Sequence, residues 1–276
     1  MALDTGPPRA FCWNPEAVSG YWDYMSARPD VEDQYFSKQL GAGIATFADM
    51  AVRLKGARVL DCGCGPGHLV AHLIERGANV YGVDSSGDSI GACNSRFEGR
   101  SRWGGAARIE GGRLPHADGT FDVVLSVETI EHVLDDELAN LLTEVRRVLR
   151  PGGTAIFTTP NDEDLAAGMN FCPACRIEYH RWQHVRSWSA DSLQSALENA
   201  GFRIQLCSDL DFRRFLPPPP LRWVDTSPRM VASRAFGLLR RMADRMERRE
   251  FPHLRSLRRR LGYGTLPNLV AVARRP

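Results

Sequence analysis

Short apolar runs alternate with amphipathic stretches along the chain from residue 56 onward. The apolar runs are rich in valine and are bounded by glycine, proline or acidic residues, as expected of buried strands. Apolar residues also recur at helical spacing in residues 68–76, 135–150 and 189–200. This alternation predicts a doubly wound α/β fold, with a mainly parallel sheet covered by helices on both faces. The predicted strands are residues 57–61, 79–84, 121–127, 154–159, 202–208 and 268–273, with a weaker candidate at 107–110.

Individual residues also predict where the three helices begin and end. Gly77 and Gly201 follow the first and third helices and suit a left-handed C-terminal stop. Asp135 is placed to cap the N-terminus of the second helix, and Pro151-Gly152-Gly153 is placed to end it.

Two segments lie outside the alternation. Residues 1–55 are rich in aromatic side chains, and we expect a helical lid here. Residues 10–40 either close over a ligand or form a helix that simply packs on the sheet. Residues 217–264 begin with four prolines and continue as an arginine-rich helical insertion. The predicted core therefore spans residues 56–216 and is completed by a last strand in residues 265–276.

The composition is that of a globular protein, with 276 residues of which 43% are hydrophobic and 25% charged. A chain of this length buries enough surface to fold without disulfides. The sequence contains no apolar run of about 18 residues, the length that a spanning helix requires. Its first ten residues lack the apolar segment of a secretory signal. We therefore expect a cytoplasmic protein, in which closely spaced cysteines favour metal binding over a disulfide.

Charge is unevenly distributed along the chain. Residues 211–276 contain 16 arginines and five acidic residues, whereas residues 1–210 contain 19 basic and 28 acidic residues. The basic end predicts contact with phosphate, nucleic acid or an anionic surface through residues 217–264. A solvated helical face explains the same composition.

A glycine-rich turn joins the first predicted strand to the first predicted helix. Gly63, Gly65 and Gly67 permit a tight turn and let a ligand approach the backbone at a helix N-terminus. The spacing differs from that of the dinucleotide-binding pattern, whose third glycine would fall at His68.

Acidic residues at the ends of the first two strands indicate the kind of ligand. Asp61 would repel a pyrophosphate, but it would attract the ammonium and sulfonium groups of S-adenosylmethionine. Asp84, followed by Ser85, can accept hydrogen bonds from both ribose hydroxyls. The predicted ligand is therefore a nucleoside that is cationic at its amino-acid end.

Four segments resemble, in the same order, successive motifs of class I S-adenosylmethionine-dependent methyltransferases. The resemblance covers about residues 56–210 and implies a Rossmann-like, seven-stranded sheet whose last strand is antiparallel. The four segments are residues 59–68, 80–85, 114–124 and 147–153.

The same resemblance implies roles for individual residues. Asp61 and the three glycines would hold the methionine part of S-adenosylmethionine, and Asp84 would hold the ribose. Glu110 is the nearest candidate for the acid on the adenine side, although the following Gly111-Gly112 departs from the usual pattern.

Two carboxylates and an imidazole follow the strand at residues 121–127. We expect Glu128-Thr-Ile-Glu131-His132 to begin a helix, which would place the three polar side chains on one face. They could hold a divalent metal or supply a general base. An acidic first helical turn, favoured by the helix dipole, is the alternative.

This pattern is similar to two groups of methyltransferases that both act on oxygen. One group comprises the O-methyltransferases of ubiquinone biosynthesis. The other methylates the 2′-hydroxyl at RNA 3′ ends, where these residues and a later histidine bind metal. The resemblance favours O-methylation, with His132 as general base and Glu131 or Glu128 orienting it or binding metal.

A cysteine and histidine cluster lies within residues 161–188. Cys172, Cys175, His180 and His184 are close to the Cys₂His₂ set of a tetrahedral zinc site, although their spacing is shorter than in a zinc finger. A variant of this site would use the Cys-Pro-x-Cys turn, one histidine and a ligand from elsewhere. Two thiols and two imidazoles without a metal are the alternative. The segment resembles an insertion in bacterial methyltransferases of natural-product or glycan pathways, and His184 also lies where the RNA 2′-O group has its later histidine.

The sequence therefore predicts an S-adenosylmethionine-dependent methyltransferase that modifies oxygen in a biosynthetic pathway. The expected acceptor is a small molecule, a phosphate-bearing molecule or a carrier-linked intermediate. The alternatives are a methyltransferase acting on the RNA 3′-terminal 2′-hydroxyl, which is less favoured because no RNA-binding module is recognisable, and a non-catalytic regulator that binds the cofactor.

Overall fold

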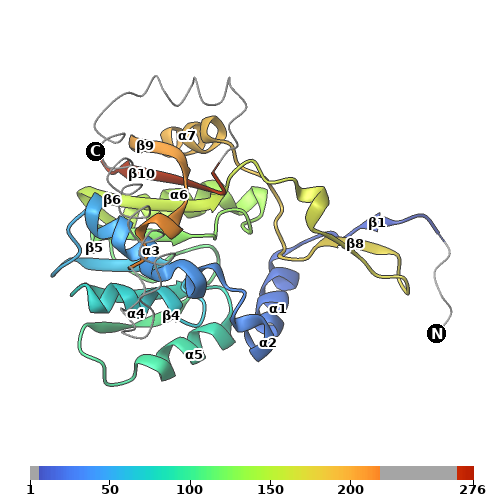
Figure 1. Ribbon diagram of the computed structural model, residues 1–276, viewed down its shortest axis with the longest axis horizontal. Coiled ribbons are helices and arrows are strands. Elements are labelled where there is room, and N and C mark those ends of the chain that lie inside the picture. The colour runs from blue at the N-terminus through green and yellow to red at the C-terminus, as the bar shows by residue number, and fades with distance from the viewer. Residues whose placement is uncertain (1–5, 218–265) are drawn as a thin grey trace, which may run out of the picture.

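The computed structural model describes residues 6–217 and 266–276 (Figure 1). The arginine-rich segment expected at residues 217–264 therefore lies outside the described residues, apart from Pro217. None of the described helices is long and apolar enough to cross a membrane.

A seven-stranded sheet forms the centre of the molecule, with the strand order β4-β3-β2-β5-β6-β10-β9. The first five strands in this order are parallel, and β10 runs antiparallel to both of its neighbours. This confirms the predicted doubly wound α/β fold and its antiparallel last strand. The strands are β2 (Arg58–Cys62), β3 (Asn79–Asp84), β4 (Trp103–Arg108), β5 (Phe121–Val127), β6 (Leu149–Pro160), β9 (Arg203–Leu210) and β10 (Asn268–Arg274).

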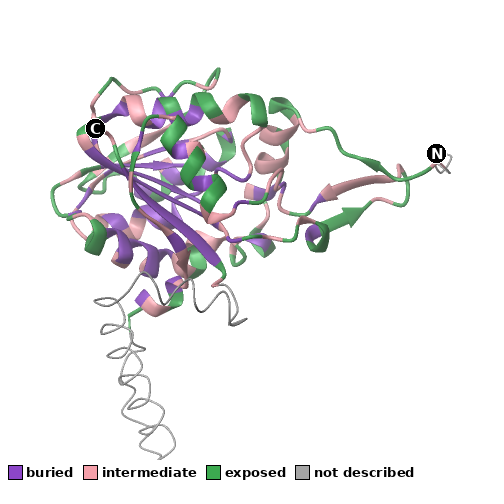
Figure 2. Cartoon of the chain, turned by 90° about the horizontal axis from the view of Figure 1, so that it is seen from above, coloured by how far each residue is buried: buried purple, intermediate pink, exposed green. Residues whose placement is uncertain are grey.

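Helices cover both faces of the sheet because successive strand residues point to opposite sides. On β2, Val59 packs into one core and Leu60 into the other, and both are fully buried. Helices α3 (Phe36–Ala51), α4 (His68–Glu75) and α5 (Gly87–Phe97) contribute to the first core. Helices α6 (Asp135–Val148) and α7 (Ala190–Asn199) contribute to the second. Figure 2 shows that the central strands are largely buried, with helices on both sides of them.

Helix ends and one strand differ in part from the sequence predictions. Gly77 and Gly201 have the expected positive φ angles, of 79° and 82°. Asp135 does not cap α6 but is its first residue, where its charge still complements the helix dipole. Pro151-Gly152-Gly153 lies within β6, since the helix has already ended at Val148. The weak strand is shifted to Trp103–Arg108.

Two further helices precede α3, namely α1 (Pro15–Ser26) and the short α2 (Pro29–Glu32). A three-stranded sheet of order β1-β8-β7 extends away from the body (Figures 1 and 2). We refer to it as the arm. Its strands are β1 (Arg9–Ala10), β7 (Met169–Phe171) and β8 (Ile177–His180), and short 3-10 helices occupy Leu165–Gly168 and Phe212–Phe215.

Candidate functional site

A cavity of about 670 Å³ lies at the carboxyl ends of β2, β3 and β5, the edge where α/β sheets bind ligands. The glycine loop after β2 forms one part of its wall, the residues after β5 form another, and α1 contributes a third. The residues that line the cavity include Ser19, Trp22, Gly63, Gly65, Asp84, Ser85, Glu128, Thr129, His132 and His184.

The glycine loop is confined by its own backbone and by its neighbours. Gly63, Gly65 and Gly67 have φ angles of 82°, 50° and 86°, in the left-handed region that favours glycine. A Cβ atom on Gly63 would lie 2.4 Å from Oγ1 of Thr129. A Cβ atom on Gly67 would lie 2.6 Å from the ring of Phe97. Gly63 thus exposes backbone to the cavity where a side chain would not fit, and Gly67 allows close packing against α5 behind it.

Asp61 has the surroundings expected of a group that binds a cation. Its side chain is buried, and its Oδ2 atom has no hydrogen-bond partner within the described residues. Burial raises the pKa of Asp61 to about 7, and the charge of Asp84 adds to the effect. Asp61 does not itself line the cavity, but the next two residues, Cys62 and Gly63, do. An unpaired buried oxygen at this position fits the cationic end of S-adenosylmethionine.

Asp84 ends β3 and is held by two backbone N–H groups. Gly65 donates to its Oδ2 at 2.8 Å, and Ser86 donates to its Oδ1 at 2.9 Å. Burial raises the pKa of Asp84, and these two hydrogen bonds oppose the increase. Each oxygen retains a lone pair for a further donor, which fits the two hydroxyls of a ribose. Ser85 lines the cavity beside it.

Glu110 is not placed at the cavity. It is exposed, forms an isolated bridge with Arg113, and lines a separate, smaller hollow. Ile109, Gly111 and Gly112 line the cavity instead. The expected adenine-side role of Glu110 is therefore not supported by its position.

The segment Glu128–His132 forms a turn and not the start of a helix, so the prediction of a shared helical face is wrong. Glu128 has a φ angle of 47°, and its N–H donates to the Thr158 carbonyl on β6 at 3.0 Å. Thr129 reaches back to the Cys62 carbonyl at 3.2 Å. These contacts to neighbouring strands hold the turn, and α6 begins only at Asp135.

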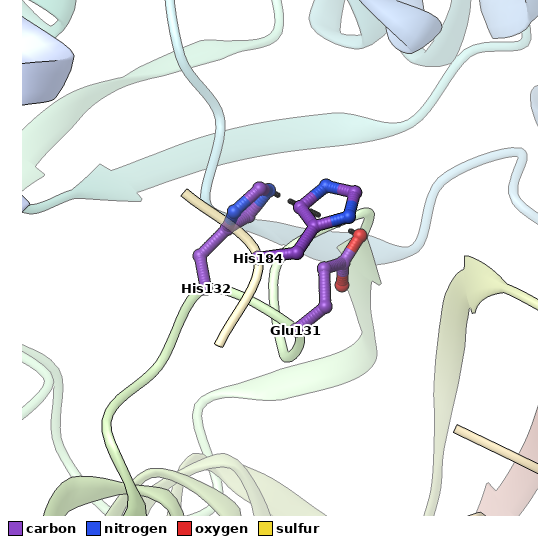
Figure 3. A group of neighbouring side chains, drawn as sticks. All are labelled: Glu131, His132 and His184. Carbon is purple, nitrogen blue, oxygen red and sulfur yellow. Dashed lines mark ion pairs between the residues drawn. The ribbon is translucent and has the colours of Figure 1, made fainter. Parts of the chain in front are cut away.

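The turn nevertheless brings Glu131 and His132 together, and His184 joins them from a distant loop (Figure 3). Their potential ligand atoms all lie within 4.8 Å of one another. Glu131 is buried, and neither of its carboxylate oxygens accepts a hydrogen bond within the described residues. Nδ1 of His132 also has no partner there. We call these three residues the Glu–His cluster.

Burial controls the protonation of this cluster. It raises the pKa of Glu131 well above its usual range, and the charge of Glu128 raises it further. Burial also raises the pKa of Glu128 to about 8, although a hydrogen bond from Thr158 opposes the increase. Burial and the neighbouring His184 lower the pKa of His132 to about 3. The unfilled hydrogen-bonding capacity of Glu131 and His132 fits a divalent cation bound by carboxylate and imidazole.

A second group of potential ligands shares His184. Nδ1 of His184 hydrogen-bonds a carboxylate oxygen of Glu163, and its ring stacks on His180 with centroids 4.5 Å apart. Burial tends to raise the pKa of Glu163, but the hydrogen bond from His184 lowers it below its usual value. Because Glu163 occupies Nδ1, Nε2 of His184 is left for the Glu–His cluster. Sequence reasoning missed Glu163, which no motif marked.

The loop that carries His184 is fixed by hydrogen bonds to the turn. The N–H of Val185 donates to the Glu131 carbonyl at 2.9 Å, and the Gln183 side chain donates to the His132 carbonyl at 2.9 Å. Gln183 also accepts a hydrogen bond from the indole of Trp22 at 2.9 Å. The Trp22 ring meets His132 edge-on, with centroids 4.8 Å apart.

Helix α1 thereby contacts both halves of the cavity. Beside Trp22 at the cluster, its Asp23 accepts a hydrogen bond from Ser86 at 2.6 Å, and its Ser26 pairs with Ser89 at 2.6 Å. Of the two expectations for the N-terminal segment, α1 fits a cover over the cavity, whereas α3 is the helix that packs on the sheet.

The proposed four-ligand zinc site is not formed. Cys172 and Cys175 lie at the tip of the β7–β8 hairpin, and His180 lies at its other end, opposite Met169. An extended strand rises about 3.3 Å per residue, so the length of β8 separates the cysteines from His180. His180 and His184 gather with Glu163 instead.

The chain matches a family model described as a methyltransferase domain over residues 33–206. The protein belongs to this family. Together with its relatives, the match identifies a class I S-adenosylmethionine-dependent methyltransferase domain.

Curated relatives carry more specific names. The methyltransferase domain is 32% identical over 157 residues to a ubiquinone biosynthesis O-methyltransferase of Rhizobium etli, covering 55% of this chain and 62% of the relative. It is 39% identical over 159 residues to the same enzyme of Rhizobium johnstonii, again covering 55% and 62%. The alignment thus spans about three fifths of each of these relatives.

Solved structures confirm the fold. The 1,6-didemethyltoxoflavin-N1-methyltransferase of Burkholderia thailandensis, which has S-adenosylhomocysteine bound, is similar with a TM-score of 0.58. The similarity covers 99% of this chain and 97% of the other at 16% identity. At that identity it establishes the architecture of the methyltransferase domain and not its acceptor.

Proposed function

We propose that the protein transfers a methyl group from S-adenosylmethionine to an oxygen atom of a small molecule or carrier-linked intermediate in a biosynthetic pathway. The observation that carries this proposal is the position of His132 and His184 in the wall of the same cavity as the glycine loop. The ubiquinone-biosynthesis relatives, named as O-methyltransferases, support the choice of oxygen.

The residues after β2 and β3 fit the cofactor. Asp61 and the backbone of Gly63, Gly65 and Gly67 would hold its methionine part, and Asp84 with Ser85 would hold its ribose. S-adenosylmethionine, when bound, supplies an electrophilic methyl group. The chain's contribution is to orient the acceptor oxygen toward that group and to exclude competing water.

The Glu–His cluster would handle the acceptor proton. Because its pKa is lowered, His132 is unprotonated at neutral pH and can accept a proton. The same low pKa makes it a weak base, so a simple proton transfer to His132 has little driving force. A divalent cation held by Glu131, His132 and His184 would supply the positive charge that acidifies a hydroxyl. The unpartnered atoms of Glu131 and His132 support this donor set.

Helix α1 favours a small acceptor over a polymer. Trp22, Val18 and Ser19 line the cavity, so α1 covers the Glu–His cluster. Hydrogen bonds join this helix to Gln183 on one side of the cavity and to Ser86 on the other. The second candidate is the 2′-hydroxyl at an RNA 3′ end. The convergence of Glu131, His132 and His184 favours it, because these residues resemble the metal-binding pattern of the enzymes that methylate RNA 3′ ends.

The test is a transfer assay with the full chain, S-adenosylmethionine labelled in the methyl group, and three sets of acceptors. These are hydroxylated aromatic molecules, their matched amines, and RNA oligonucleotides with a free or a blocked 3′-terminal 2′-hydroxyl. Label in the hydroxylated molecules alone supports the proposal. Label in RNA that disappears with the blocked terminus selects the second candidate. Label only in amines would exclude O-methylation.

A further inference from the structure

The arm carries a feature that methyl transfer does not use. Cys172 and Cys175 lie at its tip, far along the hairpin from the Glu–His cluster, and neither lines the cavity. Both thiols are free and partly exposed. Figures 1 and 2 agree that the arm projects from the body, so its tip is accessible to another molecule.

The backbone around the two cysteines already has the form of a metal-binding turn. The N–H of Cys172 donates to the Ile177 carbonyl at 2.9 Å. The N–H of Arg176 closes the turn on the Cys172 carbonyl at 2.8 Å. Arg176 has a φ angle of 55°, which bends the chain back into β8. The two cysteines are therefore held within one tight turn at the end of the hairpin.

A structural zinc ion requires four ligands, and this turn supplies two. Within residues 6–217 and 266–276, the groups of possible metal ligands are Glu131 with His132 and His184, and Glu163 with His180 and His184. Neither group includes a cysteine. The remaining ligands must come from elsewhere, and a two-fold axis through the metal would supply an identical pair.

The surface of the arm also fits a partner. Among the described residues, few large apolar side chains are exposed, and three of these, Phe11, Met169 and Phe171, lie on or directly beside its strands. Arg176 lies over the ring of Phe171 at 5.4 Å, so positive charge adjoins the thiols. Apolar side chains and cationic residues beside the turn would stabilise a contact that concentrates negative charge on four thiolates.

We propose that two copies of the chain share one zinc ion, bound by Cys172 and Cys175 of each copy at the tips of their arms. Binding converts four thiols to thiolates and releases their protons to solvent. The metal then links two methyltransferase domains through their arms, with both cavities left open. This site is separate from the Glu–His cluster and does not depend on the identity of the acceptor.

The experiment measures zinc content and mass of the full-length protein after exposure to zinc sulfate and removal of excess metal. We expect the unmodified protein to hold one zinc per two chains more than the Cys172→Ser, Cys175→Ser variant, in which the Glu–His cluster is intact. We also expect a dimer by light scattering and a tetrathiolate spectrum when cobalt replaces zinc. The double variant Cys172→Ser, Cys175→Ser should lose that zinc and become monomeric while keeping its methyl-transfer activity. The matched control is Cys12→Ser, which removes the exposed cysteine near the other strand of the arm.

Three results would overturn the proposal. A monomer that holds one zinc per chain more than the double variant would mean that the ligands are completed within one copy. A dimer that persists in the double variant would mean that other surfaces join the copies. A mass lower by two hydrogens, with no more zinc than the double variant holds, would show that the two cysteines form a disulfide instead.

Discussion

Glu163 accepts a hydrogen bond from Nδ1 of His184, and this bond determines which ring nitrogen of His184 is available to the Glu–His cluster. A carboxylate that holds the far nitrogen of a histidine fixes its tautomer and orientation and increases its basicity as a ligand. Glu163 is therefore a positioning residue for the proposed cation.

Replacing Glu163 tests this role. Glu163→Gln keeps the shape but removes the charge, so the affinity for manganese should fall by roughly 10–100-fold. Calorimetric titration of the metal-free protein with manganese measures the change. Glu163→Asp should recover part of the affinity, and the control Glu178→Gln, on the arm, should have none of these effects. Equal affinities in the Glu163→Gln variant and the unmodified protein would remove Glu163 from the site.

Asp61 makes cofactor binding dependent on pH. Because burial raises its pKa to about 7, the free protein holds a proton on Asp61 below that pH, and a cationic ligand favours the carboxylate form. Below the pKa, the fraction of protein in which Asp61 is ionised falls roughly tenfold for each unit of pH. The affinity for S-adenosylhomocysteine should therefore rise from pH 6 to pH 8 by about the same factor. Titrations in buffers of different ionisation enthalpy should show proton release.

The Asp61→Asn variant provides the control for this dependence. It should bind weakly at every pH, with a flat profile over the same range. A profile as steep as that of the unmodified protein would assign the titration to another group. The stability of the free protein should move in the opposite direction, because a raised carboxyl pKa stabilises the fold at low pH and less so as pH rises through 7.

Glu131 should be required for activity but not for stability. It is buried, and neither carboxylate oxygen has a hydrogen-bond partner within the described residues. Because burial also raises its pKa well above the usual range, an ionised carboxylate here does not stabilise the metal-free fold. Glu131→Gln should leave the unfolding midpoint unchanged or higher and lower kcat by about 100-fold or more. The exposed Asp136→Asn on α6 is the control for both measurements. A large loss of stability with normal kcat would contradict the proposed role.

Replacing Gly63 with alanine should destabilise the protein more than the same replacement at a glycine whose Cβ position is open. Its φ angle is 82°, and an added Cβ would lie 2.4 Å from Thr129. Gly99 has a φ angle of 68°, with nothing within 4 Å of an added Cβ. Gly99→Ala should cost about 1–2 kcal/mol from the backbone alone, and Gly63→Ala about 1–3 kcal/mol more from overpacking. Urea unfolding measures both.

Thr129→Ala removes the two atoms of Thr129 nearest to that added Cβ. In this background, Gly63→Ala should therefore recover part of its stability. If the two glycine variants are equally stable, Thr129 does not confine the loop.

Local sequence patterns were sufficient to predict most strands of the central sheet and the glycine loop after β2. The predicted strands at 79–84 and 121–127 agree with β3 and β5 residue for residue. The acids at the ends of β2 and β3 and the three glycines between them were also found, because strand period and turn chemistry depend only on neighbouring residues. Helix α5, with few apolar residues, carries a weaker periodic signal and was not predicted.

The acceptor side of the cavity depended on tertiary structure. Glu128–His132 forms a turn because its neighbours on β2 and β6 bond to it, although the residues alone favour the first turn of a helix. His184 was expected beside Cys172 because the two are close in sequence, but an extended hairpin carries the cysteines away and leaves His184 against Glu131 and Glu163. Spacing along a chain predicts contacts within one element, whereas contacts between loops depend on where the sheet places their ends.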